Sequence, residues 1–221
     1  MKYISYLLAI SGIYLFVFAC QPAPCTDDGC PEFNELTIPP DNIITPEATI
    51  GSLENDYTVI PVVATDNKDD FVYSLNQCII HLYKNVPKEK QIPRELIIAQ
   101  AALETGWGTS RFANEANNLF GIRTWNKDEK YLLPIPWTEW PGWGVKVFET
   151  KCDSVAHYIK IINEVFAYEE FRQVRQYHWD QGVEPDGLDL AHTLTKYASR
   201  VNYTDLVATL IKYNIRGVYE L

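Results

Sequence analysis

The N-terminal end of the chain is apolar and uncharged. Lys2 is followed by a run from Tyr3 to Ala19 that carries no charged residue. A positive residue before a short apolar run is typical of a secretory signal peptide, so we predict a signal peptide over residues 1–19. The alternative is an uncleaved transmembrane helix, because the run approaches the roughly 17–25 residues that span a bilayer.

From residue 71 onward the chain has apolar residues at helical spacing. Phe71, Leu75, Ile79 and Leu82 recur every three or four positions and therefore share one face of a predicted helix. Residues 96–103 are apolar nearly all round, which is typical of a helix buried on every side. We therefore predict that this second helix lies at the centre of the domain.

A small hairpin is predicted between the central helix and the C-terminal helices. Residues 118–125 and 144–150 flank an insertion that is rich in Pro and Trp. The second of these segments alternates Val145 and Val147 with Lys146, a period of two that favours a strand.

The C-terminal part returns to a helical pattern. Asp153 or Ser154 can cap a helix whose apolar residues recur at helical spacing. Further helices are predicted around residues 169–179, 189–198 and 203–213.

Composition divides the chain into a tail and one domain. Residues 20–68 contain many prolines and acids and indicate an extended tether, although Tyr57–Ala64 is apolar enough to dock as a strand or arm. A chain of 221 residues with 47% hydrophobic residues supports one folded unit, here residues 69–221. The formal charge of −10, concentrated between Asp27 and Asp70, disfavours nucleic acid as a partner.

The apolar run ends in a motif that resembles a lipobox. Residues 17–20 are Val-Phe-Ala-Cys, with a small residue directly before Cys20. This resemblance predicts that Cys20 is lipidated and begins the mature chain, which the lipid then anchors to a membrane. The residue directly after Cys20 is Gln21 rather than Asp, which fits sorting of a lipoprotein to the outer membrane of a diderm bacterium. We expect the domain to face the periplasm.

The cysteines have no spacing typical of a metal site. Neither a CxxC pair nor an HExxH motif is present, so we expect no metal, and we expect no cofactor. If Cys20 carries lipid, the other four cysteines allow two bridges in three connectivities. Of these we favour Cys25 with Cys30 and Cys78 with Cys152.

Glu104 is the acid whose surroundings are most unusual. It is the only charged residue of residues 96–108 and stands at the end of the predicted central helix. Desolvation and the negative end of the helix dipole both raise the pKa of a carboxyl group there. A carboxyl that stays protonated near neutral pH suits a glycosidase acid. The alternative is a solvent-facing residue at a helix end.

The surroundings of Glu104 carry a specific family resemblance. Residues 99–102 (AQAA), 104–108 (ETGWG) and 117–122 (NNLFGI) resemble, in order and separation, the glucosaminidase family of peptidoglycan hydrolases and its Bax-like branch. Tyr197 and Tyr203 match the YAxxxxY element of that family. The resemblance covers about residues 92–211. It implies a mainly α (α+β), lysozyme-like domain with a small β-hairpin beside a substrate cleft, and Glu104 as catalytic acid.

The second catalytic group is less clearly marked. Glycosidases commonly use two carboxylates, and residues 138–140 (TEW) resemble the hairpin-loop element whose Glu takes this part in several family members. This makes Glu139 the candidate, with Glu129 and Glu149 as competitors and a solvated loop acid as the alternative for Glu139. If no second acid engages, the N-acetyl group of the substrate can assist, and Tyr197 is then predicted to orient that group or a water.

Aromatic residues gather around the predicted cleft. The flat faces of indole rings suit the apolar faces of sugar rings, so these tryptophans are candidates for sugar binding. The alternative is that they pack the hairpin against the core. This alternative fits Trp107 and Trp125 better than the loop tryptophans, which include Trp143. Asn118 is predicted either to bind an acetamido group of the substrate or to stabilise its own turn by hydrogen bonds. The predicted substrate-binding residues are Trp107, Asn118, Phe120, Trp125, Trp137, Trp140 and Tyr203.

The resemblance predicts an enzyme of the bacterial cell wall. We expect a monomeric β-N-acetylglucosaminidase that hydrolyses peptidoglycan glycan strands during cell-wall remodelling. The alternatives are a muramidase or lytic transglycosylase, which needs only one acid, and a non-catalytic peptidoglycan-binding lipoprotein. A chitin-type or glycoprotein substrate is also compatible with recognition of N-acetylglucosamine.

Overall fold

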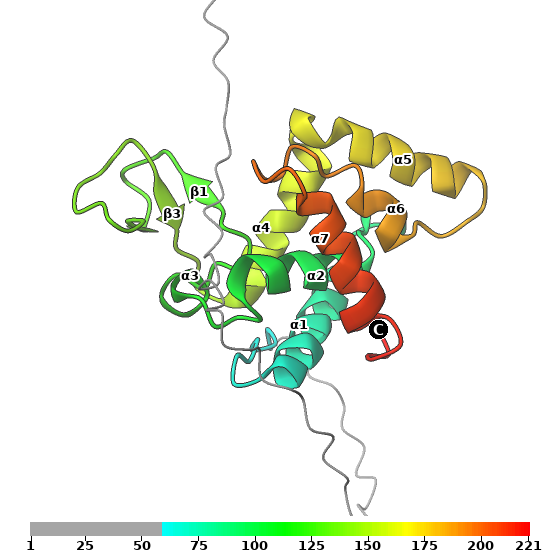
Figure 1. The fold of residues 1–221 in the computed structure, drawn as a ribbon, viewed down its shortest axis with the longest axis horizontal. Helices are drawn as coiled ribbons and strands as arrows, with labels where there is room; N and C mark the ends of the chain where they lie inside the picture. The colour runs from blue at the N-terminus through cyan, green and yellow to red at the C-terminus, as the bar shows by residue number, and fades with distance from the viewer. Residues whose placement is uncertain (1–58) are drawn as a thin grey trace, which may run out of the picture. The chain divides into compact units, whose positions relative to one another are not determined.

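The computed structural model describes residues 59–221 (Figure 1). The signal peptide, the lipidation site at Cys20, the Cys25–Cys30 bridge and most of the tether lie outside the described residues, and these remain predictions. From residue 59 onward, no helix has both the length and the apolar character needed to cross a membrane.

Helices dominate the described part of the chain, with short strands between α3 and α4. The fold is mainly α with a small sheet, as the sequence predicts. The α-helices are α1 (Lys68–Tyr83), α2 (Arg94–Thr105), α3 (Arg111–Glu115), α4 (Lys151–Glu164), α5 (Glu169–Asp180), α6 (Gly187–Ala191) and α7 (Tyr203–Leu210). The tighter or wider turns are the 3₁₀ helices η1 (Lys88–Lys90) and η2 (Phe166–Tyr168) and the π-helical turn η3 (Ile211–Ile215).

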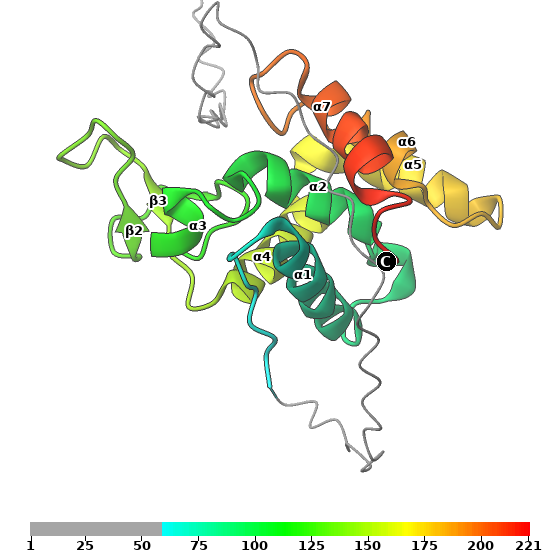
Figure 2. The ribbon, with the colours of Figure 1, turned by 60° about the horizontal axis from the view of Figure 1, so that its bottom comes forward.

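Helix α2 lies at the centre of the helical part. Residues 96–102 of α2 are buried without exception, and the helix packs against α1, α6, α7 and η3 (Figures 1 and 2). The helix ends at Gly106, which has a φ of 58° and donates its N–H to the carbonyl of Ala102. This left-handed conformation favours glycine, because a side chain there clashes with the backbone. The predicted central, buried helix is confirmed.

The start of α4 and the length of α6 correct two predictions. Helix α4 begins at Lys151 and is capped by Thr150, whose side chain forms a capping box with Asp153. Neither Asp153 nor Ser154 is the cap, because Thr150 supplies the extended backbone and the hydroxyl that a cap needs. Helix α6 ends at Ala191, and residues 193–198 form turns in which the Thr193 hydroxyl donates to the carbonyl of Leu190.

The hairpin segments form a sheet with one strand more than predicted. Strand β1 (Arg123–Thr124) pairs antiparallel with β3 (Gly144–Lys146), and β2 (Tyr131–Leu132) pairs with the other edge of β3. A Cβ atom on Gly144 would lie within 3 Å of the Tyr131 side chain, so glycine is required where these strands meet. The sheet lies to one side of the central helices in both views (Figures 1 and 2).

The segment before α1 is an arm, without a strand over residues 59–64. Val63 is buried in the core, and the N–H of Ala64 donates to the Ser74 hydroxyl of α1 at 2.9 Å. These contacts dock the end of the predicted tether on the domain.

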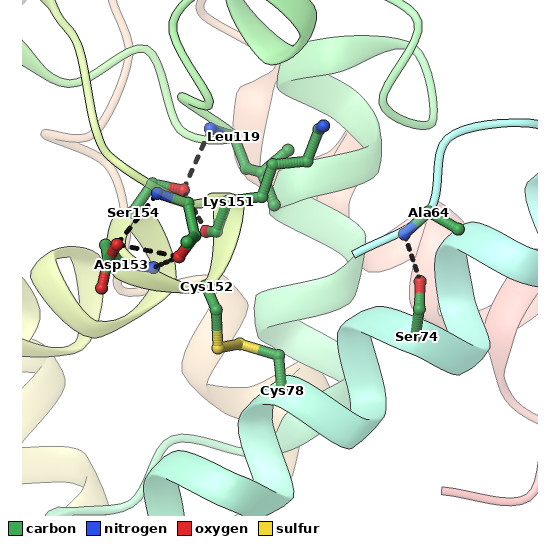
Figure 3. The surroundings of a disulfide bond; sticks show 9 residues. Ala64, Ser74, Cys78, Leu119, Lys151, Cys152, Asp153 and Ser154 are labelled. Atoms are coloured by element: carbon green, nitrogen blue, oxygen red, sulfur yellow. Dashed lines mark hydrogen bonds between the residues drawn. A yellow bond between two sulfur atoms is a disulfide. The ribbon is translucent and has the colours of Figure 1, made fainter. Parts of the chain in front are cut away.

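A buried disulfide joins α1 to the first turn of α4. Cys78 and Cys152 are bridged, which confirms one of the two predicted pairs (Figure 3). The Ser154 hydroxyl next to it donates to the carbonyl of Lys151 and accepts from the N–H of Leu119. The bridge therefore fixes the element that also holds the turn at Leu119.

The disulfide should make a large contribution to stability. It closes a loop with a sequence separation of 74 residues, for which loss of unfolded-state entropy corresponds to about 4 kcal/mol. We expect the double variant Cys78→Ala/Cys152→Ala to lose about 2–5 kcal/mol of unfolding free energy, measured by denaturant titration under oxidising conditions. Equal unfolding free energies for parent and variant would contradict this expectation.

Candidate active site

Glu104 stands in the last turn of α2, one residue before the helix ends. The residue is partly exposed, yet burial of its carboxyl group raises the pKa from 4.5 to about 7. A hydrogen bond with Tyr203 acts in the opposite direction and lowers this pKa. Glu104 forms no ion pair within residues 59–221, so no cation offsets the desolvation there. The carboxyl group is therefore divided between its protonated and ionised forms near neutral pH.

Gln100 connects Glu104 to two other helices. It is fully buried one turn before Glu104, and residues four apart share one face of a helix. Its Nε2 donates to the Tyr203 hydroxyl at 2.9 Å, and the Tyr158 hydroxyl donates to its Oε1. The Tyr203 oxygen accepts a hydrogen bond from the Gln100 amide, so the hydrogen of the Tyr203 hydroxyl is directed at Glu104. We call Tyr158, Gln100, Tyr203 and Glu104 the Gln100 network.

Aromatic rings enclose this network. Tyr197 stacks on Tyr203, with ring centroids 5.4 Å apart and planes inclined by 16°, and it also meets the rings of Tyr158 and Tyr168. Burial raises the pKa of each of these tyrosines, so all of them are neutral around Glu104. Their rings supply the apolar surroundings that disfavour the carboxylate.

The turn at residues 117–122 holds Tyr197 in place. Asn118 is fully buried, and its amide nitrogen donates to the carbonyls of Ile122 and Lys146, both at 2.8 Å. Its amide oxygen accepts from the N–H groups of Phe120 and Ile122. All of its hydrogen-bonding capacity is used within the protein, so Asn118 ties the turn.

Phe120 joins this turn to the tyrosines. Its ring stacks on Tyr158 at a centroid distance of 4.2 Å, and its carbonyl accepts from the Tyr197 hydroxyl at 3.1 Å. Two predicted substrate-binding residues, Asn118 and Phe120, thus form the wall that supports the site. The Tyr197 hydroxyl donates its hydrogen to the carbonyl of Phe120, and its oxygen remains available as an acceptor.

The tryptophans predicted to lie around the cleft occupy two separate environments. Trp107 packs edge-on against Phe71 of α1, and the Lys68 ammonium lies 4.3 Å from its ring centroid. The hairpin tryptophans lie on or near the sheet, where Trp125 and Trp137 are each 55% exposed. In the same region Trp140 packs on Tyr131, and Arg123 lies 3.8 Å from the Trp143 ring.

The three candidates for a second acid differ in their partners. Glu129 pairs with Lys146 at 2.9 Å, and hydrogen bonds from Lys146 and Thr124 lower its pKa. Glu139 lies exposed between β2 and β3, and Glu149 is exposed just before α4. Within the described part of the chain, neither Glu139 nor Glu149 takes part in an ion pair. Glu139 as second catalytic group remains a prediction.

Sequence comparison places this site in a known family. The chain matches, over residues 80–216, the sequence profile of a family described as mannosyl-glycoprotein endo-β-N-acetylglucosaminidase. The chain belongs to the glucosaminidase family. The resemblance seen in the motifs around Glu104 is thereby confirmed, and the family is one of glycoside hydrolases.

Parts of the chain are similar to individual known proteins. The chain is 31% identical over 111 residues to protein bax of Escherichia coli strain K12, covering 49% of this chain but only 38% of that protein. A peptidoglycan hydrolase from Sphingomonas sp. A1 aligns with 22% identity and a TM-score of 0.45, covering 62% of this chain and 83% of its own. The catalytic domain of the autolysin Auto from Listeria monocytogenes aligns with 21% identity and a TM-score of 0.47, covering 65% and 82%.

Three residues around Glu104 were not predicted as site residues from the sequence. Gln100 has a signal, since it is the only polar residue of residues 96–103. Tyr158 and Tyr168 have none, because they reach the site from 58 or more residues away in the sequence. As for a metal, no cluster of His, Cys, Asp and Glu able to hold one occurs in residues 59–221.

The Tyr203 hydroxyl should hold down the pKa of Glu104. Tyr203→Phe removes the hydrogen that favours the carboxylate, so we expect the Glu104 pKa to rise by about one unit above its value near 7. Carboxyl-carbon NMR titration measures this directly. Tyr177→Phe, at an exposed tyrosine of α5, is the control and should leave the Glu104 pKa unchanged. An unchanged pKa in both variants would refute the contact.

Glu104 should also lower the free energy of unfolding at neutral and alkaline pH. Its folded pKa of about 7 exceeds the ordinary 4.5, so the folded state binds more protons and the unfolding free energy falls as pH rises through this window. Glu104→Gln cannot ionise and should be more stable than the parent by roughly 1–3 kcal/mol at pH 8, given the partial exposure. The difference should flatten below pH 4.5. Thermal unfolding at several pH values tests this, and a constant difference would contradict it.

Proposed function

We propose that this protein hydrolyses glycosidic bonds in peptidoglycan glycan strands as a β-N-acetylglucosaminidase, with Glu104 as the proton donor. The observation that carries the proposal is the partly exposed Glu104 carboxyl with a pKa of about 7. A glycosidic oxygen leaves only when it is protonated, and a carboxyl group with this pKa still holds its proton near neutral pH. Membership of the glucosaminidase family supports the reaction type.

The Gln100 network fits what happens to the acid after proton transfer. Glu104 becomes a carboxylate when its proton moves to the leaving oxygen. The Tyr203 hydrogen is already directed at that carboxyl group, because Gln100 occupies the Tyr203 oxygen. Positioned donors stabilise charge as it develops without reorganising.

We assign the second catalytic part to Glu139. Its support is the resemblance of residues 138–140 to the family's hairpin-loop element, together with the absence of any ion pair at Glu139 within residues 59–221. Glu129 fits less well because Lys146 holds it ionised and paired. If Glu139→Gln retains full activity, assistance by the substrate's N-acetyl group replaces this assignment.

Sugar binding is assigned to the exposed aromatic residues of the hairpin. Trp125 and Trp137 present more than half of their surface, and their flat faces suit the apolar faces of pyranose rings. We further propose that a lipid on Cys20 anchors the protein in the outer membrane, with the tether reaching the wall for remodelling. This rests on the lipobox-like residues 17–20 and the Pro-rich stretch after them.

Substitution of the acid tests the function. We expect Glu104→Gln to slow release of soluble fragments from purified peptidoglycan by roughly 10²–10⁴-fold, the usual contribution of general acid catalysis. The control, Glu164→Gln, changes an exposed acid of α4 and should retain activity. The activity of the parent should fall as pH rises above about 7, because Glu104 then loses its proton.

Mass spectrometry of the products separates the alternatives. Reducing N-acetylglucosamine ends, made by the parent and not by Glu104→Gln, are the expected result. Anhydro-muramyl ends would instead indicate a lytic transglycosylase. No release by either protein, with binding to insoluble peptidoglycan retained, would indicate a non-catalytic wall-binding protein.

A further inference from the structure

Arg123 of β1 is a cation without an anionic partner in residues 59–221. Its guanidinium lies 3.8 Å from the Trp143 ring centroid and forms no ion pair or hydrogen bond within that part of the chain. The side chain is only partly exposed, and this burial lowers its pKa. The guanidinium nevertheless stays charged at neutral pH. Partial removal of a cation from water costs free energy, which an anionic group of a ligand would offset.

The register of the strands places Arg123 among tryptophans. Arg123 pairs with Val145 across β1 and β3, so Trp143, two residues before Val145, lies on the same face of the sheet. Trp125 is two residues after Arg123, and the same alternation directs it to this face, where it is 55% exposed. We call Arg123, Trp125 and Trp143 the Arg123 patch.

Glu129 is held on the opposite face of the sheet. Lys146 follows Val145, and Thr124 follows Arg123, so both point away from the Arg123 patch. Lys146 pairs with Glu129 at 2.9 Å, and Thr124 also forms a hydrogen bond with this carboxylate. Glu129 therefore does not neutralise Arg123.

Stacking on Trp143 determines how the guanidinium is presented. A guanidinium over an indole face keeps its N–H groups at the edge, in the plane of the group. This edge matches the two oxygens of a carboxylate. The exposed ring of Trp125 suits the apolar face of a sugar. The Arg123 patch therefore fits a sugar that carries a carboxylate.

The turn at residues 117–122 connects the Arg123 patch to the surroundings of Glu104. Phe120, whose carbonyl accepts from the Tyr197 hydroxyl, is three residues before Arg123, at most about 10 Å of extended chain. Tyr197 stacks on Tyr203, which forms a hydrogen bond with Glu104. The C-terminal end of α2 also points toward the sheet in both views (Figures 1 and 2). A glycan strand of several sugars extends over such a region.

We propose that Arg123 binds a carboxylate of the muramic-acid unit in peptidoglycan strands and thereby favours these strands over neutral polymers of N-acetylglucosamine. Muramic acid differs from glucosamine by a lactyl ether. The lactyl carboxylate is free in peptide-free strands, whereas in peptide-bearing strands it is amide-linked and the peptide supplies carboxylates. Trp125 contacts the sugar ring beside the carboxylate. The proposal rests on the proposed glucosaminidase function and names the residue that selects the polymer.

Binding to the full-length Glu104→Gln protein tests the proposal without turnover. The probes, used in calorimetric titration, are chitotetraose and the tetrasaccharide of alternating N-acetylglucosamine and N-acetylmuramic acid, with and without its peptides. Adding Arg123→Gln should weaken binding of a muramic-acid probe roughly tenfold or more, as expected for a hydrogen bond to a charged group, and leave chitotetraose binding unchanged. The control Lys160→Gln, at an exposed lysine of α4, should change no affinity.

The pattern of the losses identifies the source of the carboxylate. A loss for the peptide-free probe assigns the lactyl carboxylate, and a loss confined to the peptide-bearing probe assigns a carboxylate of the peptide. Arg123→Lys keeps the charge but not the planar fork, so its loss should be smaller than that of Arg123→Gln.

Two results would overturn the proposal. Equal weakening of all probes, chitotetraose included, would show that Arg123 supports the sheet, and unchanged binding of every probe would show that it contacts no carboxylate. Failure of the proposed function appears differently. The unmutated protein would then release no reducing N-acetylglucosamine ends from peptidoglycan, while the effect of Arg123→Gln on probe binding would persist.

Discussion

The buried amide of Gln100 is the constraint on which the site depends. A polar side chain inside an apolar helix is tolerated only when its donors and acceptors are satisfied. Tyr158 from α4 and Tyr203 from α7 supply the partners, so both helices must pack against the same face of α2. Because Glu104 lies one turn further along that face, the packing that satisfies Gln100 also encloses the acid.

The surrounding structure maintains this geometry through contacts that are distant from the chemistry. The disulfide ties α1 to the start of α4, and Ser154 in the same turn holds the N–H of Leu119. Asn118 then fixes the turn through four backbone hydrogen bonds, and the carbonyl of Phe120 positions Tyr197. A chain of satisfied polar groups thus runs from the sheet to the tyrosines.

The environment at the C-terminal end of α2 suits the role proposed for Glu104. Burial among aromatic rings disfavours the carboxylate of Glu104 there and so preserves a transferable proton.

The sequence by itself determined the family and the main helices and marked Glu104 as the candidate acid, because these depend on local pattern. The apolar run around Gln100, the glycine after Glu104 and the alternation near Val145 are short-range signals of a buried helix, its end and a strand. Only the tertiary structure decided that Tyr158 and Tyr168 join Tyr197 and Tyr203 near Glu104, that Trp107 faces α1 and that the Trp179 N–H lacks an acceptor. Tyr158 and Tyr203 meet Gln100 across 58 and 103 residues of sequence, and nothing in the local pattern specifies such pairings. They follow from packing several amphipathic helices around α2 at once.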